Sequence, residues 1–200
     1  MLRLAVFASG RGSNLEAIYS SIINGSLWGV ELALVLSNNS NSGALAFAKG
    51  KHISELHLSL LGAGNDQAAF QNEMLRALAD RRIDLIILAG YMKKLPDVVV
   101  EKFQGRIINV HPALLPEFGG IGMYGMNVHN AVIGSGKNIS GASVHLVEGE
   151  YDSGEIILQE TCPVLIADTP ESLAERINTI EHRILPQAIQ IVADRIVKNT

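Results

Sequence analysis

The chain has 200 residues, 48% hydrophobic and 18% charged, so it can bury one sizeable core, and we expect a single domain over residues 1–200. Its net charge is −4 and it has no run of lysines or arginines, which argues against nucleic acid or an anionic membrane as a partner. Cys162 is the only cysteine, so an internal disulfide is excluded. The N-terminal apolar run is shorter than the core of a signal peptide, and no apolar segment is long enough to span a bilayer. These features predict a cytoplasmic location.

Short runs rich in Val, Ile and Leu alternate along the chain with longer stretches of helical periodicity. In chain order they predict a strand over Leu2–Ala8, a helix over Asn14–Ile23, a strand over Val30–Ser37, helices over Gly43–Lys49 and Asp66–Leu78, a strand over Asp84–Ala89, a helix over Asp97–Phe103 and a strand over Arg106–Val110. This alternation implies right-handed crossovers and a parallel sheet with helices on both faces.

The pattern changes from Ser140 onward. Ala142–Val147 and Ile156–Val164 read as two more strands, joined by the polar, glycine-bearing turn Glu148–Gly154, so we expect an antiparallel edge on the sheet. The last element is a helical stretch over Pro170–Lys198, which Pro186 should kink or divide. The sequence therefore predicts a Rossmann-like, three-layer α/β/α fold whose sheet is mostly parallel, with an antiparallel edge in the C-terminal part.

Asn109 and His111 are the most informative residues for chemistry. They stand two positions apart at the end of an apolar strand, so their side chains should point to the same face, and Pro112 then forces the chain into a loop. Ligands bind at the carboxyl ends of the strands in open α/β sheets. The alternative for a lone histidine is a satisfied structural role, but the adjacent amide and the prolines favour an active site.

The first predicted strand runs into a glycine-bearing loop, Ala8–Asn14, that precedes a helix. Backbone N–H groups and the helix dipole at such a place favour an anion. Leu15 replaces the third glycine of a dinucleotide-binding loop, and no Gly-Lys-Ser/Thr follows, so a monophosphate fits better than a dinucleotide or a triphosphate. A tight turn with a capping Ser or Asn explains the loop composition equally well.

Asp152 lies in the turn between the last two predicted strands, where an aspartate is usually a turn residue. Beside His111 its carboxylate would favour the protonated imidazole, which could then donate a hydrogen bond to developing negative charge.

Four segments together resemble one known family. They are Ser9-Gly10-x-Gly12-Ser13-Asn14, Asn109-x-His111-Pro112-x-Leu114-Leu115-Pro116, Ser143-Val144-His145 and Asp152-x-Gly154. Their order and spacing over nearly the whole chain resemble the phosphoribosylglycinamide formyltransferases, the folate-dependent enzymes of purine synthesis. Asn-x-His-Pro and Asp-x-Gly are shared with other formyl-tetrahydrofolate enzymes. Gly12-Ser13-Asn14 and the absence of an extra domain point to the glycinamide ribonucleotide branch.

The resemblance implies transfer of a formyl group from 10-formyltetrahydrofolate to the amino group of 5'-phosphoribosylglycinamide. By this likeness Asn109 and His111 hold the carbonyl oxygen, and Asp152 keeps His111 protonated and moves a proton through water. The residues implied to bind the ribonucleotide are Gly12, Ser13, Asn14 and Glu181. Those implied to bind the folate are Met92, Lys93, Lys94, Leu95, Asn109, Val147 and Tyr151. The expected partners are these small molecules, with no metal, and the expected state is a monomer or a homodimer.

Some positions depart from the commonest family pattern. Gln67 stands where an arginine often lies beside the folate's glutamyl tail, which puts that contact in doubt. Glu117 replaces a frequently basic residue, and Gly119–Met126 is an unusual glycine-rich loop that we interpret as a mobile flap.

Three alternatives stay open at this point. One is another formyl transfer, for example to an amino sugar, or a deformylation. The second is a metal-dependent hydrolase that uses His111, His129, His145 and Asp152, although no paired histidine spacing supports it and His129 is expected on a helix. The third is a folate-binding or ribonucleotide-binding protein without catalysis.

Overall fold

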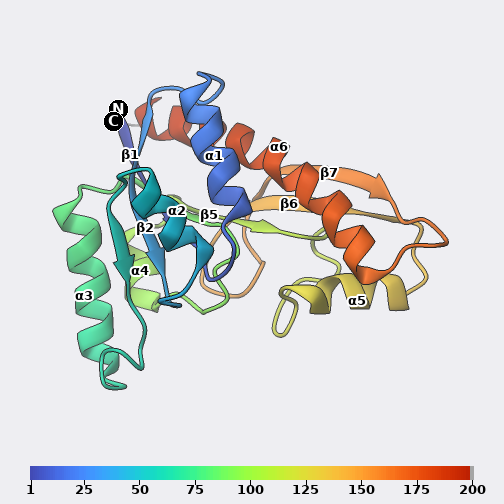
Figure 1. Ribbon diagram of the computed structural model, residues 1–200, viewed down its shortest axis with the longest axis horizontal. Coiled ribbons are helices and arrows are strands. Elements are labelled where there is room, and N and C mark those ends of the chain that lie inside the picture. The colour runs from blue at the N-terminus through green and yellow to red at the C-terminus, as the bar shows by residue number, and fades with distance from the viewer. Residues whose placement is uncertain (199–200) are drawn as a thin grey trace.

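The computed structural model describes residues 1–198 and contains one seven-stranded sheet (Figure 1). Its strands, in the order β3-β2-β1-β4-β5-β6-β7, have these bounds: β1 Leu2–Phe7, β2 Val30–Ser37, β3 Glu55–His57, β4 Leu85–Leu88, β5 Ile107–His111, β6 Ile139–Leu146 and β7 Ile156–Pro163. The pairs among β1 to β5 are parallel, whereas β5 with β6 and β6 with β7 are antiparallel. The predicted mostly parallel sheet with an antiparallel C-terminal edge is therefore confirmed.

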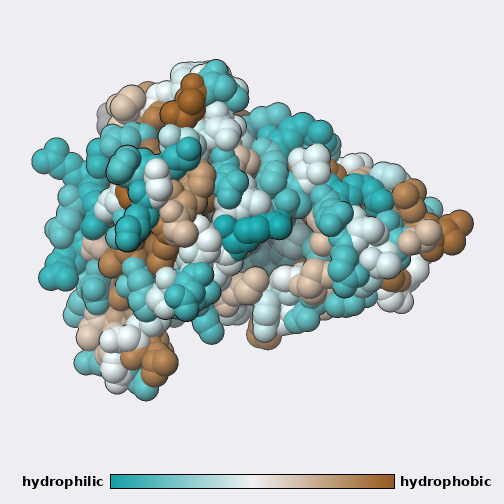
Figure 2. Space-filling model, in the orientation of Figure 1, coloured by the Kyte–Doolittle hydropathy of each residue, from teal (hydrophilic) through white to brown (hydrophobic). Residues whose placement is uncertain are grey.

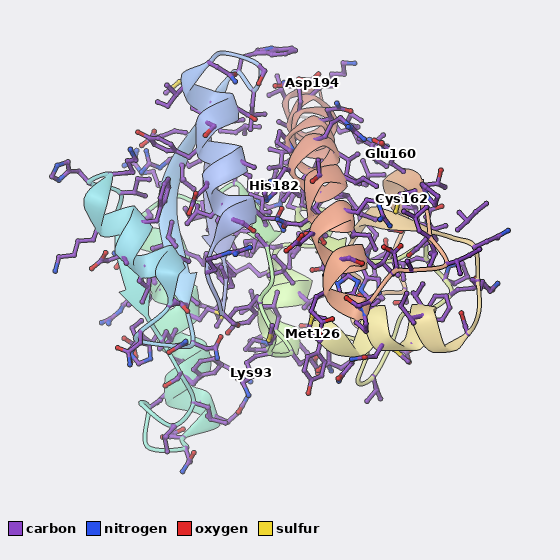
Figure 3. The ribbon with its side chains drawn as sticks, turned by 45° about the vertical axis from the view of Figure 1, so that its right-hand side comes forward. Lys93, Met126, Glu160, Cys162, His182 and Asp194 are labelled. Carbon is purple, nitrogen blue, oxygen red and sulfur yellow. The ribbon has the colours of Figure 1, made fainter. Side chains whose placement is uncertain are left out.

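Helices cover both faces of this sheet (Figure 1). Their bounds are α1 Ser13–Ile23, α2 Gly43–Gly50, α3 Gln67–Asp80, α4 Asp97–Lys102, α5 Met126–Gly134 and α6 Pro170–Lys198. Alternation along β1 explains the two layers, because Leu4 and Val6 pack in one core with α1, α2, α5 and α6, whereas Ala5 and Phe7 pack in the other with α3 and α4. Cys162 of β7 is buried in the first core, beside α6 (Figure 3).

The structure differs from the sequence-based expectation in three elements. Strand β3 was not predicted, because it has only three residues, and Glu55 and His57 are both exposed. Helix α5 was expected only as a helix around His129, without bounds. Pro186 does not divide α6, which continues through it as one helix of 29 residues. No helix within residues 1–198 is long and apolar enough to cross a membrane.

The order of the strands fixes where a ligand can enter. The connection after β1 leads to β2 on one side, and the connection after β3 returns to β4 on the other side, so the direction of winding reverses between β1 and β4. Loops diverge at the carboxyl ends of strands at such a point and leave a crevice. The functional site described below lies there and extends to β5.

Candidate active site

A pocket of about 630 Å³ opens at the carboxyl ends of β1, β4 and β5. Figure 2 shows a hollow near the centre of a mostly hydrophilic face. The walls come from the loop after β1, the loop after β4, the end of β5, the loop and helix that follow it, the β6–β7 turn and α6. This size and the mixture of apolar walls with a few polar groups are typical of a small-molecule site.

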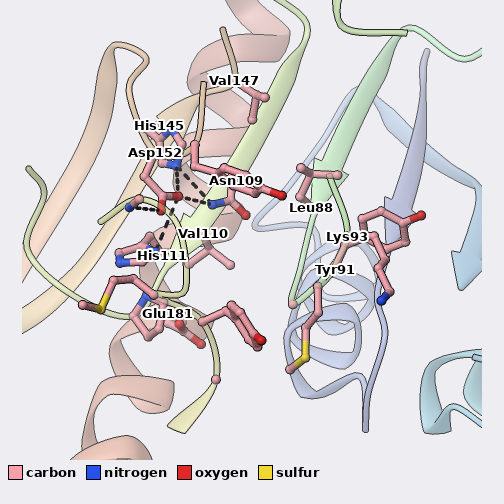
Figure 4. A pocket seen from close by; sticks show the side chains of 18 of the residues that line it. Leu88, Tyr91, Lys93, Asn109, Val110, His111, His145, Val147, Asp152 and Glu181 are labelled. Carbon is pink, nitrogen blue, oxygen red and sulfur yellow. Dashed lines mark hydrogen bonds and ion pairs between the residues drawn. The ribbon is translucent and has the colours of Figure 1, made fainter. Parts of the chain in front are cut away.

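Asn109, His111 and Asp152 come together at one side of this pocket (Figure 4). Asn109 and His111 project from β5 to the same side, as their spacing predicts. Asp152 Oδ1 lies 3.6 Å from His111 Nδ1 and accepts a hydrogen bond from Asn109 Nδ2 at 3.3 Å. His145 of β6, the cross-strand partner of Asn109, places its Nε2 3.4 Å from the same carboxylate oxygen.

Two of these residues are also bound to the segment that follows Pro116. His111 Nε2 is 2.8 Å from the carbonyl oxygen of Phe118, and it must be the donor because a carbonyl oxygen only accepts. The Gly120 N–H donates to Asp152 Oδ2 at 2.9 Å. Asp152 has a φ of +54°, a left-handed conformation that aspartate tolerates better than most residues. Movement of the 118–120 segment would therefore change the hydrogen bonds of both His111 and Asp152.

The pKa values of His111 and Asp152 are both lower than usual. Burial lowers the pKa of His111, and the Asp152 carboxylate and the Phe118 carbonyl only partly oppose it. For Asp152, burial raises the pKa, but the charge of His111 and the hydrogen bond from the Gly120 N–H lower it, and the net shift is downward. The expectation that Asp152 keeps His111 protonated is thus opposed by burial. The carboxylate pulls in the expected direction, but the net shift of the His111 pKa is downward.

Ser143 of β6 fixes the chain just after His111. Its buried hydroxyl donates to the Ala113 carbonyl at 2.7 Å and accepts from the Leu115 N–H at 3.1 Å and from Gln159 Nε2 at 2.8 Å. Gln159 Nε2 also donates to the Leu115 carbonyl at 3.1 Å. Because Pro112 ends the strand pairing of β5, these bonds replace the sheet in holding the loop.

The other end of the pocket lies at the start of α1. Gly12 caps this helix with a φ of +91°, and a Cβ built on it would lie 3.0 Å from Ala44 Cα. Ser13 Oγ donates to Asn178 Oδ1 at 3.2 Å, and Asn14 Nδ2 donates to Glu181 Oε2 at 2.9 Å. Asn14 and Glu181 line the pocket, whereas Gly12 and Ser13 do not. The buried Asn14 Oδ1 has no partner within the described chain.

Glu181 is the most perturbed carboxyl group of the pocket. It is 8% exposed, and burial raises its pKa from 4.5 to about 7, although the hydrogen bond from Asn14 acts in the opposite direction. A carboxyl group at this pKa changes its protonation state easily near neutral pH, so it can either accept or donate a hydrogen bond to a bound molecule.

All seven residues that were expected to contact a folate line the pocket: Met92, Lys93, Lys94, Leu95, Asn109, Val147 and Tyr151. Leu88 and Leu95 give this part a buried apolar wall, and Met92 and Tyr151 are half exposed at its margin. Lys94 is engaged with Asp97 at 3.1 Å on the surface.

Several residues of the pocket were not singled out from the sequence: Arg11, Tyr91, Glu175, Asn178 and the backbone N–H of Gly120. Burial raises the pKa of Tyr91 to about 12. Asn178 and Glu181 stand three positions apart on α6, so they share a face of that helix, and this spacing was the one available signal. His129 lines the pocket from α5, with a buried Nδ1 that has no partner in the described chain. Within residues 1–198, no group of three or more His, Cys, Asp or Glu side chains could hold a metal ion.

Comparison with known proteins places this geometry in a family context. The family model described as formyl transferase matches residues 2–189. A chloroplastic phosphoribosylglycinamide formyltransferase of Arabidopsis thaliana is 37% identical over 98% of this chain and 67% of the relative. The trifunctional purine biosynthetic protein adenosine-3 of Gallus gallus is 38% identical over 96% of this chain, which spans only 18% of that protein. The crystal structure of glycinamide ribonucleotide transformylase 1 from Symbiobacterium toebii matches with a TM-score of 0.89 at 35% identity, covering 97% of this chain and 88% of that one.

Proposed function

Because this chain belongs to the formyl transferase family, we propose that it transfers the formyl group of 10-formyltetrahydrofolate to the amino group of 5'-phosphoribosylglycinamide, a step of de novo purine biosynthesis. The observation that carries the proposal is the convergence of Asn109, His111 and Asp152 at a pocket with an apolar wall on one side and the N-terminus of α1, which favours an anion, on the other. The substrate amine is itself the nucleophile, so the reaction requires no serine or cysteine nucleophile.

Asn109 and His111 face the formyl oxygen in this proposal. They donate hydrogen bonds to it when the amine nitrogen bonds to the formyl carbon and the oxygen becomes negative. Both donors are occupied in the free protein, since Asn109 Nδ2 donates to Asp152 and the His111 ring donates to Phe118. The substrate oxygen must therefore replace these acceptors. The segment around Phe118 must yield as it does so, in agreement with the interpretation of Gly119–Met126 as a mobile flap.

Asp152 transfers the proton in this mechanism. Its pKa is below the usual range, so the carboxylate is ionised near neutral pH and can accept a proton from the attacking amine through a water molecule. The proton passes to the folate nitrogen when the carbon–nitrogen bond of the donor breaks. The negative charge that develops on the formyl oxygen also raises the affinity of the neighbouring His111 for a proton, against the effect of its burial.

The start of α1 holds the ribonucleotide phosphate. Gly12, Ser13 and Asn14 provide backbone N–H groups at the positive end of the helix dipole, and Arg11 adds a cation at the same place. The unpartnered Asn14 Oδ1 and the Glu181 carboxyl group remain available for the ribose hydroxyls. A buried polar atom without a partner is costly, so the gap at Asn14 supports a contact with bound substrate.

The folate donor occupies the other side of the pocket. Leu88, Leu95 and Val147 present apolar surface to a flat ring, and Met92 and Tyr151 can close over its edge. These residues fit such a group, because a largely apolar wall with a few polar contacts is what an aromatic ligand requires. The bound folate supplies the activated formyl group, and this wall orients it toward Asn109.

A spectrophotometric assay with a 10-formyl folate analogue and phosphoribosylglycinamide tests the proposal. We expect acceptor-dependent folate release by the wild type and a loss of roughly 100-fold to 1000-fold in kcat for His111→Ala and for Asp152→Asn. His57→Ala is the matched control, because His57 is exposed on β3 and does not line the pocket. Folate release without acceptor would identify a deformylase instead. Turnover only with a different amine would overturn the acceptor but keep the chemistry.

Three further expectations belong to this proposal. The reaction needs no metal, so activity should survive dialysis against a chelator. The protein acts as a monomer or a homodimer, which sedimentation at several concentrations distinguishes. Its location is cytoplasmic, although the Arabidopsis relative is named as chloroplastic, and cell fractionation decides between the two compartments.

A further inference from the structure

His145 lies directly opposite Asn109 in the β5–β6 ladder and is 1% exposed. Within the described chain, its two ring nitrogens make three polar contacts. Nδ1 lies 2.7 Å from the Leu146 carbonyl oxygen, and Nε2 lies 3.1 Å from Asn109 Nδ2 and 3.4 Å from Asp152 Oδ1 (Figure 4). His145 itself does not contact the substrate in the proposed reaction. It contacts Asn109, which does, and Asp152, which acts on the substrate through water.

The first contact determines the tautomer of the ring. A carbonyl oxygen has no hydrogen to give, so His145 Nδ1 must carry one and donate it to Leu146. Asp152 Oδ1, 3.4 Å from Nε2, is an acceptor too and provides no hydrogen, so both atoms need a donor. In the neutral ring Nε2 has a lone pair and accepts. The atom that faces it from Asn109 must therefore be the amide nitrogen, as the 3.1 Å contact has it.

The tautomer in turn determines which way the Asn109 amide faces. In the observed orientation, Asn109 Nδ2 donates to His145 Nε2 and to Asp152 Oδ1. In the reversed orientation the amide oxygen would face the lone pair of Nε2 and the carboxylate, and both contacts would be repulsive. The bond to Nε2 is the shorter of the two, at 3.1 Å against 3.3 Å.

We propose that His145 is a positioning residue: as the Nδ1–H tautomer, it holds one hydrogen of the Asn109 amide, so that the second hydrogen is free to move from Asp152 to the substrate oxygen. The role in catalysis rests on the proposed function, whereas the tautomer and the amide orientation are properties of the free protein. A fixed donor needs little reorganisation during the reaction, which is the basis of electrostatic stabilisation.

Two amide variants of His145 separate positioning from simple loss of a buried ring. In His145→Gln the amide oxygen reaches the place of Nε2 and can accept from Asn109. In His145→Asn the side chain is one methylene shorter and reaches only the place of Nδ1. We expect His145→Gln to keep kcat within several-fold of the wild type, and His145→Asn to lose roughly 10-fold to 100-fold in kcat with KM nearly unchanged. Thermal melting and folate binding by both variants show that they fold.

Imidazole ¹⁵N NMR of the wild-type protein, assigned by comparison with His145→Gln, reports the tautomer directly. We expect a protonated Nδ1 and an unprotonated Nε2. A protonated Nε2, or folded Gln and Asn variants with equal kcat, would overturn the proposal. A wild type without activity toward phosphoribosylglycinamide but with the expected tautomer would overturn the proposed substrate and leave the orientation of Asn109 standing.

Discussion

Replacing Ser143 with alanine removes three hydrogen bonds from one fully buried oxygen atom. Gln159 Nε2 still donates to the Leu115 carbonyl, so its amide keeps a hydrogen-bond partner. The Ala113 carbonyl and the Leu115 N–H lose the partner that Ser143 provides. At about 1 kcal/mol for each net hydrogen bond, with a penalty for the buried groups left behind, we expect a loss of roughly 2 to 4 kcal/mol in the free energy of unfolding.

The chain provides a matched control on the same strand. Ser140 is also buried in β6, but its Oγ has no hydrogen-bond partner in the described chain, so Ser140→Ala should change stability by less than about 1 kcal/mol or increase it. Equilibrium unfolding in guanidinium measures both variants. For a chain of this size, Ser143→Ala should also lower Tm by roughly 5 to 15 °C.

The same substitution should reduce activity, because Ser143 holds the loop that directly follows His111. We expect kcat of Ser143→Ala to fall roughly 10-fold at a temperature where the variant is fully folded. Equal stability losses for Ser143→Ala and Ser140→Ala would refute the reasoning. They would mean that the hydrogen bonds of the Ser143 hydroxyl add nothing to the free energy of unfolding beyond what the packing of the side chain contributes.

Three shorter predictions concern other residues. The raised pKa of Glu181 favours its neutral form in the folded state, so its stabilising contribution is complete below pH 4.5 and is lost as pH rises through about 7. Urea unfolding should therefore show Glu181→Gln gaining stability over the wild type across this range, by about 3 kcal/mol at most. In Gly119→Ala, the new Cβ would lie 2.6 Å from Leu115 Cδ2 and 3.2 Å from Asp152 Cβ, so steady-state kinetics should show kcat reduced roughly 10-fold, with folate binding retained. In Gly141→Ala, the Cβ would overlap a backbone carbonyl of β7, so thermal melting should show a loss of more than about 3 kcal/mol, or the protein should fail to fold.

Most of the fold could be predicted from the sequence, because apolar runs and helical periodicity report burial directly. Strand β3 escaped this signal, since only its middle residue is partly buried and it lies at the edge of the sheet, paired with β2. Pro186 was expected to kink or divide α6. The helix continues because the missing N–H of a proline costs one hydrogen bond, whereas the buried residues on both sides of it pack against the sheet.

The candidate site was predictable only where its residues share an element. Asn109 and His111 follow from alternation on one strand. That Asp152 meets them depends on the length and shape of the β6–β7 turn, including its own positive φ, and no local pattern encodes this. The roles of the Phe118 carbonyl and the Gly120 N–H could not be predicted from the sequence either. Every residue has a carbonyl and nearly every residue an N–H, and only the fold determines where they point.

The pocket draws its walls from segments as far apart as Arg11 and Glu181. A chain that leaves the ribosome with its N-terminus first cannot complete this pocket until α6 has been made, since α6 provides one wall and also packs on α1. Fragments that stop before α6 lack the carboxyl group that faces Asn14. The ribonucleotide site is therefore complete only after α6 has packed on α1.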